Sequence, residues 1–116
     1  MIESIAFTVY PVKDMARSRK FYEQVLGLKM THNWSDQWVE YDVGDTTFAI
    51  TVADDAHQAG AKGASIAFEV ADFDKASALL KERGARFETH DGSVCLSAVL
   101  HDPDGNEVII HKRKAD

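Results

Sequence analysis

Two carboxylates and two histidines stand in segments where polar and apolar residues alternate. Glu40 and Glu69 each lie in such a segment, and His101 and His111 lie near the end of the chain. Carboxylate and imidazole groups together can bind a cation, or a carboxylate can act as a general base that imidazole assists. A carboxylate in a confined site also favours a cationic or amine-bearing ligand. The plainer alternative for Glu69 and His111 is a polar side chain that reaches solvent at a strand end.

The segments that must position these side chains occur twice. Residues 4–9 read Ser-Ile-Ala-Phe-Thr-Val, and residues 65–70 read Ser-Ile-Ala-Phe-Glu-Val. A repeat unit that cannot bury its own apolar face must pack against a copy of itself. The sequence therefore predicts a single domain, residues 1–116, built from two modules at approximately residues 1–58 and 59–116.

Each copy of this string is followed by a helical pattern with start and stop signals. Asp14 and Asp72 come before apolar residues at helical spacing, and Gly27 and Gly84 come after them. Aspartate accepts hydrogen bonds from the free N–H groups of a first turn, and glycine adopts the left-handed conformation that closes a last turn. Each predicted strand thus leads into a helix.

Beyond each helix the pattern changes to the alternation that is typical of strands. Two pairs of such segments flank turn-forming residues, and one short strand is expected before each pair. The expected strands are residues 28–32, 38–43 and 47–52 in the first module, and residues 86–89, 95–100 and 107–111 in the second. Strand, helix and three strands, twice over, is an α+β fold.

Composition excludes several classes of protein. The chain has 116 residues, enough for one domain with a real core, and its formal net charge of −6 disfavours binding to a nucleic-acid backbone. No apolar run approaches the roughly 20 residues of a membrane span. The single cysteine, Cys95, cannot form an internal disulfide, and residues 1–4 lack the features of a signal peptide. We expect a cytoplasmic protein that binds neither nucleic acid nor membrane.

Two stretches resemble the vicinal oxygen chelate superfamily, which includes glyoxalase I, extradiol dioxygenases, fosfomycin resistance enzymes and bleomycin resistance proteins. They are residues 14–28, which contain Phe21-Tyr22 and Leu26-Gly27-Leu28, and residues 102–107, which read Asp-Pro-Asp-Gly-Asn-Glu. The resemblance implies paired βαβββ modules whose curved mixed sheet encloses a cleft, with the helices outside. Modules of this superfamily commonly complete their clefts with those of another chain, so the resemblance also implies a homodimer.

Alternation assigns the two faces of each strand. The large apolar residues are expected under the helices, and this core set comprises Ile5, Phe7, Val9, Val39, Tyr41, Val43, Phe48, Ile50, Val52, Ile66, Phe68, Val70, Val108 and Ile110. Residues between them then face the cleft. The candidate ligand-binding set is Thr8, Trp38, Glu40, Thr47, Thr51, Ser65, Glu69, Val99, His101, Ile109 and His111.

The resemblance also implies places for metal ligands, because the metal-dependent relatives carry donors at the start of the first strand of each module and inside the last strand. Here those places hold Ser4, Ser65 and Ile109, and a fourth place falls near Ala49 or Thr51. Two hydroxyls and an isoleucine cannot replace imidazole or carboxylate ligands. We therefore expect no metal and no other cofactor. A displaced site built from inward-facing carboxylates and histidines is the alternative.

Three functions remain open. We favour a metal-independent protein that sequesters a drug or metabolite, as bleomycin resistance proteins do, with Glu69 binding a cationic group and Trp38 stacking on a planar ligand. The second is a lyase, isomerase or dioxygenase-like enzyme with a displaced or metal-free site, in which Glu69 or Glu40 is the general base and His101 or His111 assists. The third is a structural or interaction domain without a ligand.

Overall fold

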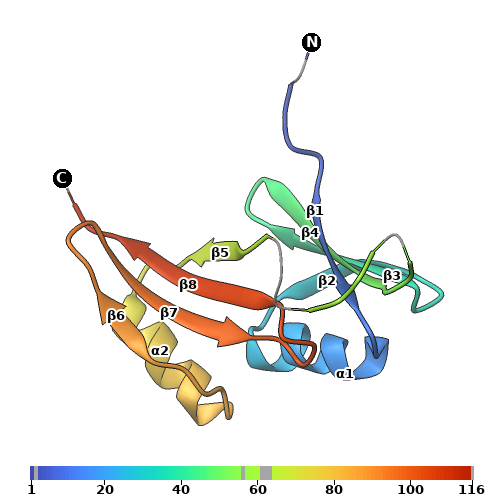
Figure 1. The fold of residues 1–116 in the computed structure, drawn as a ribbon. Helices are drawn as coiled ribbons and strands as arrows, with labels where there is room; N and C mark the ends of the chain where they lie inside the picture. Colours follow the sequence, from blue (N-terminus) through green and yellow to red (C-terminus); the bar gives the residue numbers. More distant parts are fainter. Residues whose placement is uncertain (2, 56, 61–63, 116) are drawn as a thin grey trace. The chain divides into compact units, whose positions relative to one another are not determined.

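The computed structural model describes residues 1, 3–55, 57–60 and 64–115, and it divides into two compact units, Met1–Gly60 and Ala61–Asp116. Each unit contains one helical segment and one four-stranded mixed sheet (Figure 1). The strand order is β1-β4-β3-β2 in the first sheet and β5-β8-β7-β6 in the second. The predicted α+β fold with two βαβββ modules is confirmed.

The first unit comprises β1 (Thr8–Val12), α1 (Met15–Arg19), the π-helical segment η1 (Lys20–Val25), β2 (Lys29–Trp34), β3 (Trp38–Val43) and β4 (Thr46–Val52). The second unit comprises β5 (Ile66–Glu69), α2 (Phe73–Glu82), β6 (Thr89–Asp91), β7 (Cys95–His101) and β8 (Glu107–Arg113). None of the helices in the described ranges is long and apolar enough to cross a membrane.

Both helices begin and end at the predicted residues. The Asp14 carboxylate accepts a hydrogen bond from the backbone N–H of Arg17 at 3.1 Å, and Asp72 accepts one from the N–H of Lys75 at 3.0 Å. These bonds satisfy donors that the first helical turn leaves without a partner. At the other ends Gly27 and Gly84 have φ angles of 75° and 88°, where a side chain would be strained.

The recurring string does not mark equivalent positions, which corrects the alignment of the two halves. Its second copy ends at Val70, two residues before the cap of α2, but its first copy ends at Val9, five residues before the cap of α1. Strand β1 begins only at Thr8 and runs to Val12, which is itself two residues before its cap. The first copy is therefore displaced by three residues, and an odd displacement exchanges the two faces of a strand.

The expected core positions of the first strand are wrong for this reason. Ile5 and Phe7 are 70% and 46% exposed, and both precede β1. Tyr10 and Val12 are buried in their place, whereas Val9 points to the opposite side of the sheet. Six expected core residues of the other strands are buried, with less than a tenth of the residue exposed at Val39, Tyr41, Phe48, Ile50, Val108 and Ile110. The other expected core residues are only partly buried, namely Val43, Val52, Ile66, Phe68 and Val70.

A polar network that the sequence did not reveal joins the first helical segment to its sheet. The buried hydroxyl of Tyr41 donates to Glu23 Oε2 at 2.9 Å, and Arg19 Nε donates to the same oxygen at 2.7 Å. Burial, and then the hydrogen bond to Glu23, raises the pKa of Tyr41. Arg19 Nη1 also reaches Asp36 at 3.3 Å, so the network connects the helix to the turn between β2 and β3.

The turn between β7 and β8 sets the register of the second sheet. The Asp102 carboxylate accepts hydrogen bonds from the backbone N–H groups of Asp104 and Asn106 at 2.9 and 2.8 Å. Asp102 is 4% exposed, so these bonds compensate for its burial. The turn brings His101 opposite Glu107, and alternate residues of both strands then share a face.

Replacement of Ile50 by alanine should test the corrected faces, because Ile50 is fully buried whereas Phe7 is half exposed. We expect Ile50→Ala to lower the free energy of unfolding by about 2 to 5 kcal/mol through lost burial and a residual cavity. Phe7→Ala should cost about 1 kcal/mol or less. Denaturant titration measures both values. Equal large losses would place Phe7 in the core after all.

Candidate functional site

One side of the first sheet faces away from its helical segment. The ring of Tyr22 in η1 lies 6.3 Å from Tyr41 and 5.1 Å from Phe48, so η1 covers the side that carries these residues. Side chains between them in β3 and β4 point the other way. This first helix-distal face comprises Val9, Pro11, Lys29, His32, Trp34, Trp38, Glu40, Asp42, Thr47, Ala49 and Thr51.

Glu40 is the central polar residue of the first helix-distal face. Its Oε2 accepts a hydrogen bond from Trp38 Nε1 at 2.9 Å, and its Oε1 lies 3.8 Å from His32 Nδ1. The Glu40 side chain is 22% exposed, so part of its hydration is lost. A bulge between Met30 and His32 turns His32 toward this face. One oxygen of the Glu40 carboxylate is therefore hydrogen-bonded to Trp38, whereas the other faces the more distant His32 ring.

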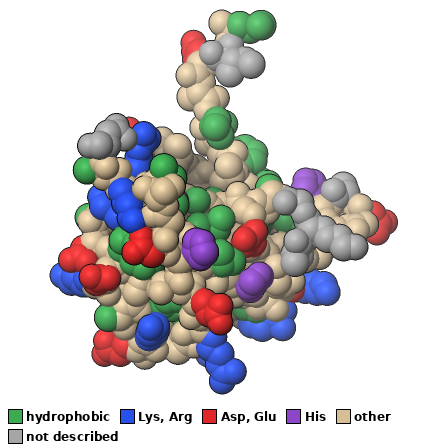
Figure 2. Space-filling model, turned by 60° about the vertical axis from the view of Figure 1, so that its left-hand side comes forward, with side chains coloured by type: hydrophobic (Ala, Val, Ile, Leu, Met, Phe, Trp, Pro, Cys, Tyr) green, Lys and Arg blue, Asp and Glu red, His purple; other side chains and the backbone are tan. Residues whose placement is uncertain are grey.

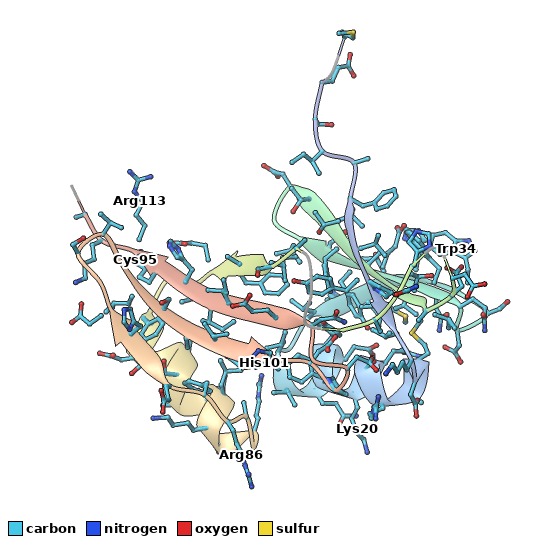
Figure 3. All side chains as sticks on the ribbon, viewed as in Figure 1. Lys20, Trp34, Arg86, Cys95, His101 and Arg113 are labelled. Carbon is cyan, nitrogen blue, oxygen red and sulfur yellow. The ribbon has the colours of Figure 1, made fainter. Side chains whose placement is uncertain are left out.

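Aromatic rings surround this carboxylate. Phe7 meets Trp38 edge to face, with ring centroids 5.3 Å apart, and His32 stacks on Trp34 at 5.2 Å and 16°. Trp34 is 51% exposed and lies at the end of β2 (Figure 3). Phe7, His32, Trp34, Trp38 and Glu40 form what we call the aromatic–carboxylate cluster. Both tryptophans of the chain belong to it.

The corresponding side of the second sheet is the second helix-distal face. Phe73, Ser77 and Leu80 of α2 are buried, and α2 runs along one side of the sheet (Figure 1). The other side carries three rows of residues that lie opposite one another across the strands. These rows are His90, Ser97, His111 and Glu69; then Val99, Ile109 and Ala67; then His101, Glu107 and Ser65, whose hydroxyl donates to Glu107.

The rows give this face a definite chemical pattern. An apolar band, which contains Val99 and Ile109, lies between two rows of histidine, serine and glutamate side chains. Residues four apart in a strand are separated by about 13 Å, so the two polar rows are about that far apart. A ligand with an apolar body and hydrogen-bonding groups at both ends matches this spacing.

Glu69 and His111 form a pair within the first of these rows. Glu69 Oε1 lies 2.5 Å from His111 Nδ1, and Glu69 Oε2 accepts a hydrogen bond from the backbone N–H of Arg113 at 2.9 Å. The Arg113 N–H and then the His111 ring lower the pKa of Glu69. An ionised carboxylate only accepts hydrogen bonds, so Nδ1 of His111 is the donor in this pair, and Nε2 can act as an acceptor in the neutral form of the ring.

Two hollows open beside the polar rows. One has a volume of about 450 Å³ and is lined by Glu88, Thr89, His90, Ser97, Val99 and His101. The other, of about 500 Å³, is lined by Ser93, Val94, Cys95, His111, Arg113, Lys114 and Ala115. Cys95 and Arg113 lie opposite each other on β7 and β8 (Figure 3). On the visible surface, charged and histidine side chains are interspersed with hydrophobic ones (Figure 2).

The predicted site residues divide between the two faces, with one exception. Trp38, Glu40, Thr47 and Thr51 lie on the first helix-distal face. The second helix-distal face carries the remaining predicted residues, namely Ser65, Glu69, Val99, His101, Ile109 and His111. Thr8 is the exception, because it pairs with Phe48 and shares the helix side with Tyr10. Trp38 is hydrogen-bonded to Glu40 in the first unit, and Glu69 is hydrogen-bonded to His111 in the second unit.

Sequence reasoning missed several residues of these faces, among them Phe7, His32, Trp34 and His90. Phe7 was assigned to the core, and His32, Trp34 and His90 were not among the predicted site residues. His32 reaches its face through a bulge, which alternation does not reveal, whereas the pairing of His90 with Ser97 is readable only once the short strand β6 is placed. Trp34 lies opposite Trp38 across β2 and β3, and only its proximity to Trp38 in the sequence was a signal.

The expected metal-ligand places do not fit a metal. The residue that corresponds to Ser65 in the first unit is Phe7, not Ser4, once the repeat is aligned on the helix caps. Phe7 offers no donor atom, Ser65 donates to Glu107, and Ile109 is apolar. Among the residues that the structure describes, no three His, Cys, Asp or Glu side chains gather in an arrangement that could hold a metal ion. The donors present are therefore unsuited to the metal chemistry of the metal-dependent relatives.

The sequence matches the family described as glyoxalase/bleomycin resistance protein/dioxygenase superfamily over residues 4–110. None of the curated proteins compared with the sequence matches it.

Solved structures of similar fold share little sequence with this chain. An antibiotic binding protein, TnmS3 from Streptomyces sp. CB03234, superposes with a TM-score of 0.84 at 20% identity, covering 97% of this chain and 98% of that chain. A lactoylglutathione lyase from Agrobacterium tumefaciens gives 0.80 at 19% identity, with coverages of 97% and 95%. A superfamily member from Sphaerobacter thermophilus DSM 20745 gives 0.78 at 21%, with coverages of 97% and 98%. At these identities the likeness establishes the fold alone.

Titration of Glu69 should report the pair that it forms with His111. We expect its pKa in the folded protein to lie below the ordinary value of 4.5. The ionised form then stabilises the fold at pH values above the unfolded pKa, and this contribution is lost as the pH falls through the folded pKa. Carbon-detected NMR measures the midpoint.

His111→Ala is the matched variant for this titration. It should raise the pKa of Glu69 only part of the way to 4.5, because the N–H of Arg113, the larger cause, remains. A midpoint that does not move in His111→Ala would show that the imidazole does not bond to Glu69 in solution.

Proposed function

The chain belongs to the glyoxalase/bleomycin resistance protein/dioxygenase superfamily, and from this premise we propose that it is a metal-independent protein that binds a small molecule on its helix-distal faces. One observation carries the proposal. The places where metal-dependent relatives hold ligands are Phe7, Ser65 and Ile109, yet the faces around them present aromatic, apolar and hydrogen-bonding side chains. That combination is typical of small-molecule sites.

One structural neighbour supports this proposal. TnmS3 shares the fold along nearly the whole chain and is an antibiotic binding protein. We infer the same class of activity here, sequestration of a drug or metabolite without chemistry. That the protein is a cytoplasmic homodimer and binds no nucleic acid remains a prediction.

Removal of metal should leave ligand binding unchanged. We expect protein purified without chelator to carry much less than one transition metal per chain by elemental analysis, since the ligand places lack donors. A compound whose free concentration is one hundred times its Kd adds about 2.7 kcal/mol to the free energy of unfolding. This raises the midpoint temperature of thermal unfolding by roughly ten degrees. Bleomycin and a panel of planar antibiotics, assayed by thermal shift with and without EDTA, should include at least one such compound.

Two outcomes would contradict the proposal. About one zinc, nickel, iron or manganese ion per chain, with binding lost on chelation, would show that a displaced metal site exists. A panel in which no compound shifts the midpoint would favour a structural or interaction domain.

The Glu69–His111 pair favours a second candidate, a metal-free enzyme. Glu69 holds Nδ1 of the His111 ring, and in the neutral form of such a ring Nε2 can accept a proton from a bound compound as a general base. Ser97 lies directly opposite His111, where its hydroxyl offers a further hydrogen-bonding group. In this arrangement Glu69 is the positioning residue and His111 the proton acceptor.

Mass spectrometry of the recovered ligand separates the two candidates. If the protein only binds, every compound should be recovered unchanged after long incubation, and this is the result we expect. Catalysis would instead produce a change that His111→Asn abolishes. His101→Asn, on the neighbouring strand of the same face, should then retain it.

A further inference from the structure

The aromatic–carboxylate cluster of the first helix-distal face has the chemistry of a cation site. Trp34 is 51% exposed and Phe7 is 46% exposed, so a large apolar side chain meets water at each end of the cluster. Exposed apolar patches of this kind commonly mark binding sites. The rings of Phe7 and Trp38 are in contact, as are those of His32 and Trp34, so the cluster is already assembled without a ligand.

Glu40 gives this aromatic surface a negative charge. Its Oε2 is held by Trp38 at 2.9 Å, while Oε1 is 3.8 Å from His32 Nδ1, beyond a hydrogen bond. Lys29, at the start of β2, lies opposite Asp42 rather than Glu40. An aromatic surface with a carboxylate attracts cations through the ring quadrupoles and through charge.

We propose that the aromatic–carboxylate cluster binds an organic cation of the quaternary or tertiary ammonium class. This proposal rests on the proposed function and names the ligand chemistry of one of its two faces. An alkylated ammonium has an apolar surface that contacts aromatic rings, and it carries a charge that Glu40 compensates. A metal ion would find a single carboxylate here, and an anion would be repelled by it.

The second helix-distal face offers a contrast within the same chain. This face carries two carboxylates, and both already have partners. Glu69 bonds to the His111 ring and to the Arg113 N–H, and Glu107 accepts a hydrogen bond from the Ser65 hydroxyl. A ligand cation would have to compete with these partners. Glu69 therefore serves as the control carboxylate for a test of Glu40.

The test uses choline and its neutral carbon isostere, 3,3-dimethyl-1-butanol. Titration calorimetry, and NMR of the two indole N–H signals, should show choline binding at least about tenfold more tightly than the isostere. Glu40→Gln keeps an oxygen for Trp38 but loses the charge, and it should weaken choline binding by about tenfold. Trp34→Leu, at an exposed position, should weaken it as well. Glu69→Gln should leave the affinity within about twofold of wild type.

Several results would overturn the inference. Equal affinity for choline and its isostere would show that charge is not recognised. A loss in Glu69→Gln without a loss in Glu40→Gln would move the site to the other face. Absence of choline binding at millimolar concentration, in protein that still unfolds cooperatively, would also reject it. If antibiotics of the panel bind the same sample, only this inference fails; if none binds, the proposed function fails with it.

Discussion

The parallel pairing of the first and last strands of each unit is the constraint on which both helix-distal faces depend. Tyr10 lies opposite Ile50, and Phe68 lies opposite Ile110. Because side chains alternate with a period of two, this register decides which residues of the strands meet the helix and which face away. The antiparallel pairing of β3 with β4 obeys the same rule, because a shift of β3 by one residue relative to β4 would turn Glu40 toward η1 and Tyr41 away from it. Burial of the apolar residues against the helix therefore determines which residues lie in the polar rows of the opposite face.

Much of the fold could be predicted because its signals are local. The caps Asp14 and Asp72, the glycines after each helix and the turn at Asp102 each specify a boundary through their own hydrogen bonds or backbone angles. The faces of β3, β4, β7 and β8 followed from alternation alone. The first strand did not, because a matching string of six residues carried no information about which residues hydrogen-bond to β4. The helix cap was the better reference, since it is tied to the end of the strand.

The candidate site was harder to predict because it depends on contacts between distant segments. Alternation placed Trp38 and Glu40 on one face, but the hydrogen bond between them, the bulge that brings His32 beside them and the approach of Phe7 are tertiary features. The Arg19–Glu23–Tyr41 network was invisible for the same reason. Sequence pattern thus identified the strands of the site and about half of its side chains.

The two helix-distal faces have equivalent positions in the fold but carry side chains of different chemistry. At the equivalent places Phe7 and Ser65, one unit adds a ring to an aromatic surface and the other adds a hydroxyl that donates to Glu107. Neither Phe7 nor Ser65 affects the packing of the core, because both residues lie on the side of the sheet opposite the helix.

An aromatic surface around one carboxylate leaves apolar area and a charge exposed to water. The free-energy cost of the exposed apolar area and that of the unpaired charge both fall when an apolar cation covers them. On the second face both carboxylates already have partners, since Glu69 bonds to His111 and Arg113 and Glu107 accepts from Ser65, and an apolar band lies between the polar rows. Two distinct ligand preferences can therefore arise from one duplicated module by exchange of side chains on its helix-distal face.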